Sequence, residues 1–274
     1  MTDLVLSAGA QITDGEFQAL RGWIYQQAGI HLSDQKKALV CGRLAARIRH
    51  YQLARYGDYF QLIEDGRHPE EAQMAVDLLT TNETHFFREP RHFDFLRDQV
   101  VPAHDARRPL RVWSAACSSG EEPYSIAMTL ASSLQGGPWE VLASDLSTRV
   151  LDRARQGHYP MARAKTIPPA CLREHCLKGT GRHEGTFIVA PHVAGRVRFS
   201  QINLNEPLPP VGEFDVIFLR NVMIYFDGPT KQQVTQRVLS CLRPGGHLVI
   251  GHSESLTHVN GTMKAVAPAV YRKP

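Results

Sequence analysis

The sequence lacks the cysteine, hydrophobic and histidine patterns that would assign it to several common classes of protein. Its five cysteines are odd in number, include no C-x-x-C pair and follow no zinc spacing, which predicts reduced thiols rather than a disulfide framework. No apolar run approaches the length of a membrane span, and no secretion signal opens the chain. The thirteen histidines form no H-E-x-x-H motif, so no metal site is expected. These absences predict a cytoplasmic protein without direct membrane insertion.

A strong charge of one sign is missing as well. The 274 residues carry a formal net charge of +4, which is too small and too dispersed to argue for nucleic acid as a partner. This length allows one large domain or two small ones, and it is enough for an ordinary hydrophobic core.

The chain before about residue 105 has helical patterns throughout. Thr13 and Glu16 form a capping box that begins a helix, and Gly29 ends it. Further helices are predicted from Ser33 onward, at about residues 58–65, and at residues 69–79.

The predicted helix that begins at Ser33 carries a basic stripe. Lys36, Arg43 and Arg47 recur at helical spacing on a different side from the apolar residues. Such a stripe is either an ordinary solvated face or a surface that recognises an acidic partner.

After about residue 105, short apolar runs alternate with helical patterns. Strands are expected at residues 111–115, 141–144, 197–202, 214–219 and 247–250. This alternation predicts an α/β fold, in which helices cover both faces of a parallel sheet. The ligand crevice of such a sheet lies at the carboxyl ends of its strands.

The first predicted strand runs into the turn SAACSSGEEP, which has small residues but no G-x-G-x-x-G fingerprint. Its single glycine, Gly120, precedes the acidic pair Glu121 and Glu122. Two carboxylates would repel a pyrophosphate, so a dinucleotide is not expected there. The alternative is an ordinary strand-to-helix connection with acidic residues at the helix N-terminus.

Polar residues follow the other strand ends. Asp145 ends the second strand, where a carboxylate can accept hydrogen bonds from both hydroxyls of a ribose. Asn203 and Leu204 follow the third strand and could frame a base, and the fourth leads into Arg220, Asn221 and Tyr225. A ribose acceptor without a phosphate cradle indicates a nucleoside, and the cationic S-adenosylmethionine suits the acidic surroundings.

Five motifs, found in one order over most of the chain, resemble those of the bacterial chemotaxis receptor methyltransferases, the CheR family. They are TNETHFFRE, RVWSAACSSGEEPYSIA, SDLSTRVLDRARQGHY, RNVMIYF and GHSES. The resemblance implies an α/β fold class: a Rossmann-like S-adenosylmethionine-dependent methyltransferase with an N-terminal helical domain and a small inserted antiparallel β-subdomain. We expect the helical substrate-recognition domain and its linker at residues 1–90, the methyltransferase domain at 91–274, and the insert at about 157–195.

The resemblance also implies the activity. Methyl groups would pass from S-adenosylmethionine to glutamate side chains of methyl-accepting chemotaxis receptors, giving γ-glutamyl methyl esters and S-adenosylhomocysteine during sensory adaptation. The enzyme would be a monomer in the cytoplasm that associates with membrane receptor clusters. Because glutamate has an ordinary pKa of about 4.3, it is already ionised near neutrality and no catalytic base is needed.

Site residues follow by motif from the same resemblance. The expected catalytic residues, closest to the transferred methyl group, are Arg88 and Tyr225. The expected cofactor contacts are Asn82, Thr84, Arg88, Glu122, Asp145, Asn203, Leu204, Arg220 and Asn221.

Two regions are candidates for receptor binding. Lys36, Arg43 and Arg47 would recognise glutamate-rich receptor helices by complementary charge. Gly179, Gly181 and Gly185 match an insert that docks a receptor tail by strand addition. Lys178 and Ile188 stand where that family pattern has arginines, so a plain hairpin is the alternative.

Two other classes of function remain open. One is methylation of a nucleic acid or a small molecule, although the missing D/N-P-P-Y/F motif and the modest charge oppose nucleic acid. The other is a regulatory module that binds a nucleoside without turnover.

Overall fold

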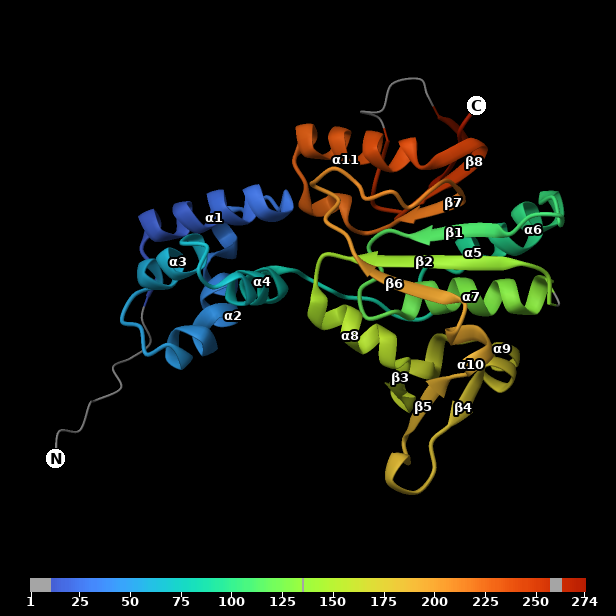
Figure 1. The fold of residues 1–274 in the computed structure, drawn as a ribbon, viewed down its shortest axis with the longest axis horizontal. Helices are drawn as coiled ribbons and strands as arrows, with labels where there is room; N and C mark the ends of the chain where they lie inside the picture. Colours follow the sequence, from blue (N-terminus) through green and yellow to red (C-terminus); the bar gives the residue numbers. More distant parts are fainter. Residues whose placement is uncertain (1–10, 135, 257–262) are drawn as a thin grey trace. The chain divides into compact units, whose positions relative to one another are not determined.

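The computed structural model describes residues 11–134, 136–256 and 263–274, and the chain forms two compact units (Figure 1). The first unit contains the described residues up to Thr81 together with Tyr225–Asp227. The second contains Asn82–Ile224 and the described residues from Gly228 onward.

The first unit is helical, as predicted. Its elements are α1 (Asp14–Ala28), the short 3-10 helix η1 (Asp34–Lys36), α2 (Lys37–His50), α3 (Tyr56–Glu64) and α4 (Pro69–Leu79). The capping box is present at the start of α1, and Gly29 ends this helix with a φ of 69°. Apolar side chains from each helix form the core of the unit, including Leu20, Val40, Tyr59 and Ala75.

A segment far along the chain also belongs to this unit. The N–H of His31 donates to the carbonyl oxygen of Tyr225 at 2.8 Å, and the Tyr25 hydroxyl donates to Asp227 Oδ2 at 3.0 Å. These contacts attach Tyr225–Asp227 to the end of α1 and the residues that follow it.

The second unit is built on a seven-stranded sheet with the order β6-β2-β1-β7-β8-β10-β9. The five expected strands are present and parallel: β1 (Leu110–Ser114), β2 (Trp139–Asp145), β6 (Val197–Gln201), β7 (Phe214–Leu219) and β8 (Leu242–Ile250). Two further strands, β9 (Lys264–Ala267) and β10 (Val270–Arg272), were not expected. β10 lies antiparallel to both of its neighbours.

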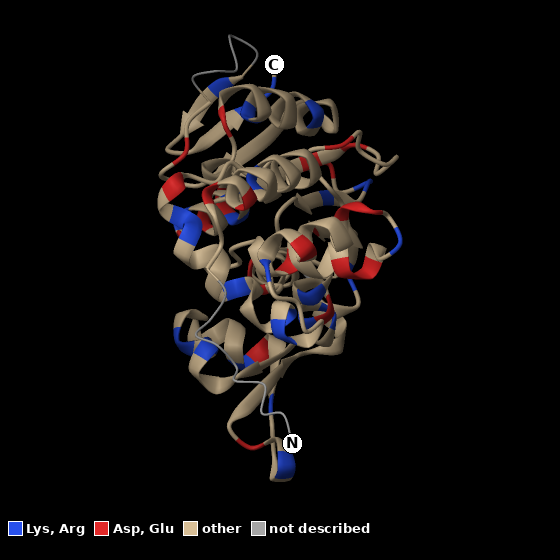
Figure 2. Ribbon diagram, turned by 90° about the vertical axis from the view of Figure 1, so that its left-hand side faces the viewer, with Lys and Arg blue, Asp and Glu red and all other residues tan. Residues whose placement is uncertain are grey.

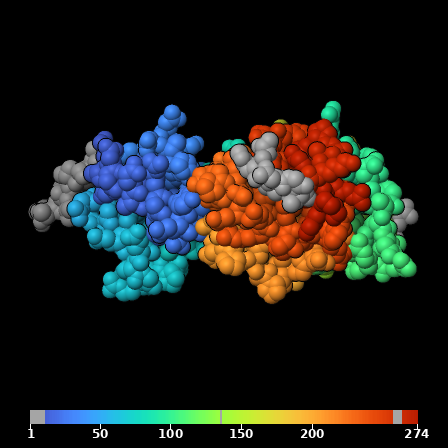
Figure 3. Space-filling model, turned by 90° about the horizontal axis from the view of Figure 1, so that it is seen from above, coloured from blue at the N-terminus to red at the C-terminus, as the bar shows by residue number. Residues whose placement is uncertain are grey.

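Helices cover the sheet on both faces, which confirms the α/β prediction. The strand order moves outward from β1 in both directions, so right-handed connections place α7 (Glu121–Leu134) and α8 (Thr148–Gln156) on one face and α11 (Gly228–Ser240) on the other. The main core lies between the sheet and α7, joined by α5 (Arg91–Phe95) and the π-helix η2 (Leu96–Val100), which leads into α6 (Val101–Ala103). The residues of α11 and of the C-terminal strands form the orange and red surface in Figure 3.

The expected insert is also present. Between α8 and β6, the strands β3 (His158–Pro160), β5 (Thr186–Val189) and β4 (Cys176–Lys178) form a separate antiparallel sheet in the order β3-β5-β4. Short helices join these strands: η3 (Met161–Thr166), α9 (Pro169–His175), η4 (Gly181–His183) and α10 (Pro191–Ala194). Phe187 and Val189 of the insert join the core that covers α7.

The division between the units falls earlier than the expected boundary at residue 90. Residues 82–90 group with the second unit. The physical reason is that Phe86 and Phe87 lie in the core of that unit, where the Phe86 ring meets those of Tyr159 and Phe187. Among the described residues, no helix is long and apolar enough to span a membrane.

Candidate active site

The carboxyl ends of β1, β2 and β7 meet at one edge of the parallel sheet, as the strand pattern predicts. The turn after β1 and the end of β2 are joined by a hydrogen bond, in which the N–H of Ser118 donates to Asp145 Oδ2 at 2.8 Å. The other oxygen of Asp145 accepts from the N–H of Ser147 at 3.0 Å. This carboxylate, only 7% exposed, therefore fixes the two loops that would surround a ligand.

The single glycine of the first turn has a steric explanation. Gly120 has a φ of 98°, and a Cβ atom there would lie 2.7 Å from the Tyr159 hydroxyl and 2.9 Å from the Cβ of Ala154. The turn is thus pressed against α8 and the insert. The other small residues of the turn do not form a G-x-G-x-x-G fingerprint.

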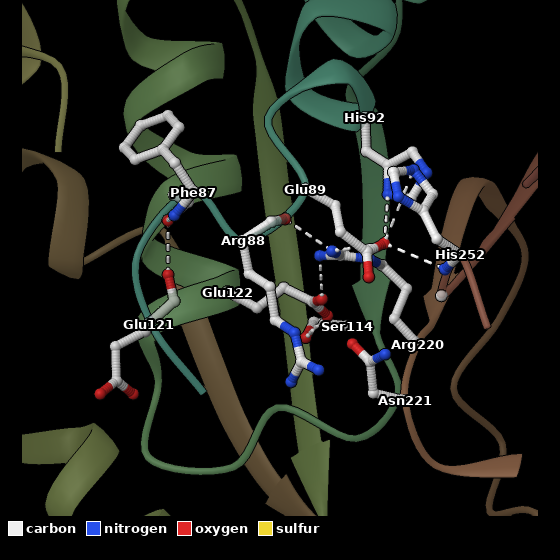
Figure 4. Close-up of polar contacts among 12 residues, drawn as sticks. Phe87, Arg88, Glu89, His92, Ser114, Glu121, Glu122, Arg220, Asn221 and His252 are labelled. Carbon is white, nitrogen blue, oxygen red and sulfur yellow. Dashed lines mark hydrogen bonds and ion pairs between the residues drawn. The ribbon is translucent and has the colours of Figure 1, made fainter. Parts of the chain in front are cut away.

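The acidic pair at the start of α7 divides between two environments. Glu122 accepts from the Ser114 hydroxyl and from Arg220 Nη1, both at 2.7 Å. Glu121 is buried, accepts from the Ser119 hydroxyl at 2.7 Å and lies 3.3 Å from Arg163 Nη1 of the insert. Burial raises the pKa of Glu121. Only Glu122 therefore joins the polar cluster at the strand ends (Figure 4).

Arg220 is the centre of that cluster, and its side chain is only 1% exposed. It pairs with Glu122 and with Glu89, whose Oε2 lies 3.1 Å from Arg220 Nη2. The same Nη2 donates to the carbonyl oxygen of Arg88 at 2.6 Å. Arg220 therefore holds the backbone of the 82–90 segment as well as a carboxylate of α7.

Arg88 lies in an unusual stretch of backbone. Its neighbours Phe87 and Glu89 both have positive φ, 52° and 58°, which non-glycine residues adopt rarely and at some cost in energy. Figure 4 shows the carbonyl group of Arg88 facing Arg220, while the guanidinium of Arg88 points away from Glu89. The guanidinium donates to the carbonyl oxygen of Glu83 at 3.1 Å. The same rare backbone region is found at Ser118 and Asn221, so the strain gathers around the site.

Asn221 is held by a residue that the sequence did not single out. Glu254 Oε2 accepts from the N–H groups of Asn221 at 2.9 Å and Gly251 at 2.8 Å, and Oε1 accepts from the N–H of Met223 at 2.8 Å. Glu254 belongs to the GHSES motif, which was noted as a motif without a role for its glutamate. It shapes the loop between β7 and Tyr225.

Sequence reasoning also missed a group next to Arg220. The His92 side chain is 1% exposed, and its Nδ1 lies 3.5 Å from Glu89 Oε2. Burial, reinforced by the Arg220 charge, lowers the pKa of His92 to about 4. Burial also raises the pKa of the Glu89 carboxyl, but the charge of Arg220 and its hydrogen bond outweigh this effect, so the pKa lies below its ordinary value.

The other expected cofactor residues lie in neighbouring loops of the second unit. The carbonyl oxygen of Asn82 accepts from the Ser118 hydroxyl at 2.9 Å, and that of Thr84 accepts from Arg163 Nη1 at 2.8 Å. After β6, Asn203 Oδ1 accepts from the N–H of Asn205 at 3.0 Å, and Leu204 is buried. Asn82 is thus joined directly to the first turn.

Tyr225, the second expected catalytic residue, ends the short 3-10 helix η5 (Met223–Tyr225). By its contacts it groups with the helical unit, whereas Asn221 groups with the methyltransferase unit. Its catalytic role stays a prediction from the motif RNVMIYF.

Two residues of the basic stripe, Arg43 and Arg47, lie on α2 and make contacts within the helical unit, which was neither of the two alternatives left open by the sequence. Arg43 donates to the carbonyl oxygens of Leu79 and Thr80 at 2.7 and 2.9 Å. Arg47 Nε donates to Glu71 Oε1 at 2.8 Å, and this carboxylate is 3% exposed. Both guanidinium groups hold α4 against α2, so their charges are used within the unit, and Lys36 is left as the exposed member of the three.

The glycines of the insert shape its own hairpin. A Cβ atom at Gly179 would lie 2.1 Å from the carbonyl oxygen of His183, and Gly181 and Gly185 have positive φ. Lys178 and Ile188 are both exposed. The turn therefore explains these glycines without a bound peptide, and tail docking stays a prediction.

Comparison with known proteins identifies the family of this chain. Residues 15–80 match the family model described as CheR methyltransferase, all-alpha domain, and residues 82–271 match CheR methyltransferase, SAM binding domain. A chemotaxis protein methyltransferase of Escherichia coli K12 is 44% identical over 95% of this chain and 91% of its own length. Chemotaxis protein methyltransferase 2 of Pseudomonas aeruginosa is 43% identical over 94% of this chain and 93% of its own length.

Among solved structures, the N-methyltransferase NodS of Bradyrhizobium japonicum in complex with S-adenosylhomocysteine has a TM-score of 0.41 and 14% identity, covering 78% of this chain and 97% of its own. The two family models together cover nearly the whole described chain, and their boundary coincides with the division between the units. The chain belongs to the CheR methyltransferase family and is an S-adenosylmethionine-dependent methyltransferase.

Proposed function

We propose that the protein methylates glutamate side chains of chemotaxis receptors. The observation that carries the proposal is a pair of carboxylates beside a turn without a phosphate cradle. Asp145 ends β2, and Glu122 lies at the start of α7, where it accepts from Ser114 at the end of β1. These groups suit a cationic nucleoside and oppose a nucleotide. Membership of the CheR family supports a chemotaxis receptor as the methyl acceptor, because the relatives named above are chemotaxis protein methyltransferases.

The residues present fit S-adenosylmethionine. Asp145 would hold the ribose, Glu122 and Arg220 would face the polar end of the cofactor, and Asn203 with Leu204 would border the base. The buried Nε of Arg220 has no hydrogen-bond partner among the described residues, so this N–H group can donate a hydrogen bond to a ligand. When bound, the cofactor supplies an electrophilic methyl group whose bonding electron pair leaves with the sulfur.

The remaining chemistry belongs to the substrate carboxylate and to its positioning. The glutamate is already ionised near neutrality, so its oxygen attacks directly and no proton has to be removed. Holding the reacting atoms in line can contribute on the order of 7–11 kcal/mol. Arg88 is suited to this task because its guanidinium can hold the second carboxylate oxygen while the first attacks. Tyr225 would orient the same carboxylate.

An assay with receptor-containing membranes and methyl-labelled S-adenosylmethionine tests the function. We expect base-labile label on receptor glutamates and none on nucleic acid. Cofactor binding without transfer would instead indicate a nucleoside-sensing module, and label on small molecules alone would indicate the other enzyme class. An Arg88→Ala variant serves as the inactive control.

Lys36, which ends η1 just before α2, is the exposed part of the basic stripe that can meet a receptor. Figure 2 shows Lys and Arg residues interspersed with Asp and Glu residues along the ribbon. A local contact by Lys36 with an acidic receptor helix is compatible with this mixture. We propose that the protein acts in the cytoplasm as a monomer that encounters receptor clusters in this way.

Tail docking would use the insert. β4 is an edge strand of the sheet β3-β5-β4, which is the position that strand addition requires. Titration of the insert's backbone amide signals with a receptor tail peptide checks it: selective shifts in β4 support docking, and unshifted signals leave a plain hairpin.

A further inference from the structure

Beside Arg220, three side chains from two distant parts of the chain come together. His92 belongs to α5, Glu89 lies just before that helix, and His252 lies in the loop after β8. Each offers one ligand atom, and these three atoms lie within 4.8 Å of one another. We propose that Glu89, His92 and His252 form a binding site for a divalent transition-metal ion, with zinc as the best match.

The buried imidazole is the observation that points to a ligand. Both ring nitrogens of His92 are buried, and neither makes a hydrogen bond of ordinary geometry with the described residues; the backbone of Pro268 offers only a weaker interaction. A buried polar group without a partner normally costs about 1–3 kcal/mol and calls for an explanation. Figure 4 shows the His92 and His252 rings side by side, with Glu89 reaching toward both.

The distances allow coordination after small movements. Glu89 Oε2 lies 3.5 Å from His92 Nδ1 and 3.9 Å from His252 Nε2. Ligand atoms about 2.0–2.2 Å from one zinc ion would stand slightly closer together than this. His252 is 47% exposed, so its ring can shift without disturbing the core, and an ion can enter from its side.

The ligand set and its surroundings suit zinc. Two histidines and one glutamate form a known zinc ligand set that leaves a fourth position for water. Glu89 Oε2 already accepts from the backbone N–H of His252 at 3.3 Å and faces Arg220 at 3.1 Å, so it has outer donors of the kind that orient ligating carboxylates.

The positive charge of Arg220 would repel a cation, but the carboxylates of Glu89 and Glu122 compensate this charge. Glu122 lies 2.7 Å from the same guanidinium. Arg220, Glu89 and Glu122 together carry one net negative charge, so a dication enters a region that is not already positive. Sequence spacing could not reveal this set, because His252 is contributed by a separate strand end.

Calorimetric titration of the untagged full-length protein with zinc sulfate tests the site. Loss of an outer-shell partner weakens metal binding about 10–100-fold, so loss of a ligand in His252→Ala should weaken it by at least about 100-fold. The control is His183→Ala, which removes an exposed histidine of the insert that also lies beside another histidine ring. Thermal melting verifies that both variants are folded.

A crystal soaked with zinc locates the ion directly through its anomalous signal. A peak between Glu89, His92 and His252, together with weakened binding only in His252→Ala, supports the site. Absence of a peak there, or zinc affinity that is equal in wild type and His252→Ala, would overturn the proposal. Neither readout depends on methyl transfer, so the outcome is independent of the proposed function.

Discussion

At the scale of single residues, the site is organised by side chains that fix the backbone around a ligand. Asp145 joins two loops, Arg220 holds the carbonyl of Arg88, and Glu254 gathers three backbone N–H groups. Positive φ at Phe87 and Glu89 shows that the Arg88 backbone is kept in a costly conformation by its surroundings. Such preorganisation is what a positioning mechanism requires, because the geometry is set before the substrate arrives.

The cofactor role of Asp145 can be tested by removing its charge while keeping its shape. Asp145→Asn should weaken S-adenosylhomocysteine binding by about 1.5–3 kcal/mol, the range for a hydrogen bond to a charged group. Isothermal calorimetry measures the change. Asp152→Asn, an exposed carboxylate on α8, is the matched control and should bind normally. Equal affinities for all three proteins would remove Asp145 from the site.

Arg88 and Tyr225 can be separated by kinetics. Tyr225→Phe keeps the ring, so cofactor affinity should be retained while kcat falls; Arg88→Ala should lower kcat further. Initial rates of receptor methylation give both values. Arg91→Ala removes a nearby exposed arginine and should have little effect. Wild-type rates in both Tyr225→Phe and Arg88→Ala would show that neither residue positions the carboxylate.

At the scale of elements, the structure shows which patterns the sequence could predict. The capped helix α1 and the five parallel strands follow from local periodicity and end signals. β9 and β10 were missed because β9 is largely exposed and lacks alternation between apolar and polar residues. The strand-end residues were predictable because parallel strands bring their carboxyl ends together.

The remaining site residues depend on contacts that spacing does not encode. Glu254 and His252 reach the site from the loop after β8, and no local pattern relates them to Asn221 or Glu89. The two arginines of α2 fell at helical spacing, which is equally typical of a solvated face and of an interface with another helix. Their partners come from α4 and the residues after it, so only the packed structure distinguishes the two cases.

The α2–α4 contact predicts a pH-dependent stability. Glu71 is buried and accepts hydrogen bonds from Tyr59 at 2.6 Å and from Arg47. Burial opposes its ionisation, but these hydrogen bonds outweigh burial and lower its pKa. Glu71→Gln should therefore reduce the free energy of unfolding of the helical unit by about 1.5–3 kcal/mol at neutral pH.

The sign of the pH effect follows from the lowered pKa. The stabilisation by the Glu71 carboxylate is complete above its unfolded pKa of about 4.3 and is lost as the pH falls through the lower folded value. Denaturant unfolding from pH 7 to pH 3 should show the difference between wild type and Glu71→Gln shrinking with acid. Glu70→Gln, an exposed neighbour, is the control. A difference that is constant with pH would contradict this account.

At the scale of the whole molecule, function divides between a unit that carries the cofactor residues and a unit that we propose meets the receptor. Reversing the charge of Lys36 with Lys36→Glu should raise the KM for receptor more than it lowers kcat and leave cofactor affinity unchanged. Salt should reduce the difference, since exposed charges are screened over about 8 Å at physiological ionic strength.

Initial-rate methylation of receptor membranes over a salt series measures this effect. Arg107→Glu reverses an exposed charge of the other unit and should leave the KM unchanged. The same KM for wild type and Lys36→Glu at low salt would show that Lys36 belongs to an ordinary solvated surface.

The helical unit includes a short segment from late in the chain. Tyr225–Asp227 group with the helices, while the residues on either side of this segment group with the sheet. A chimaera that receives only residues 1–81 of a relative would place a foreign α1 against the resident Tyr225 and Asp227. Its recombination points should therefore lie after Thr81, before Tyr225 and after Asp227. On the proposal that the helical unit meets the receptor, the part of the protein that selects the substrate consists of two separate segments of the chain, and the second segment includes Tyr225.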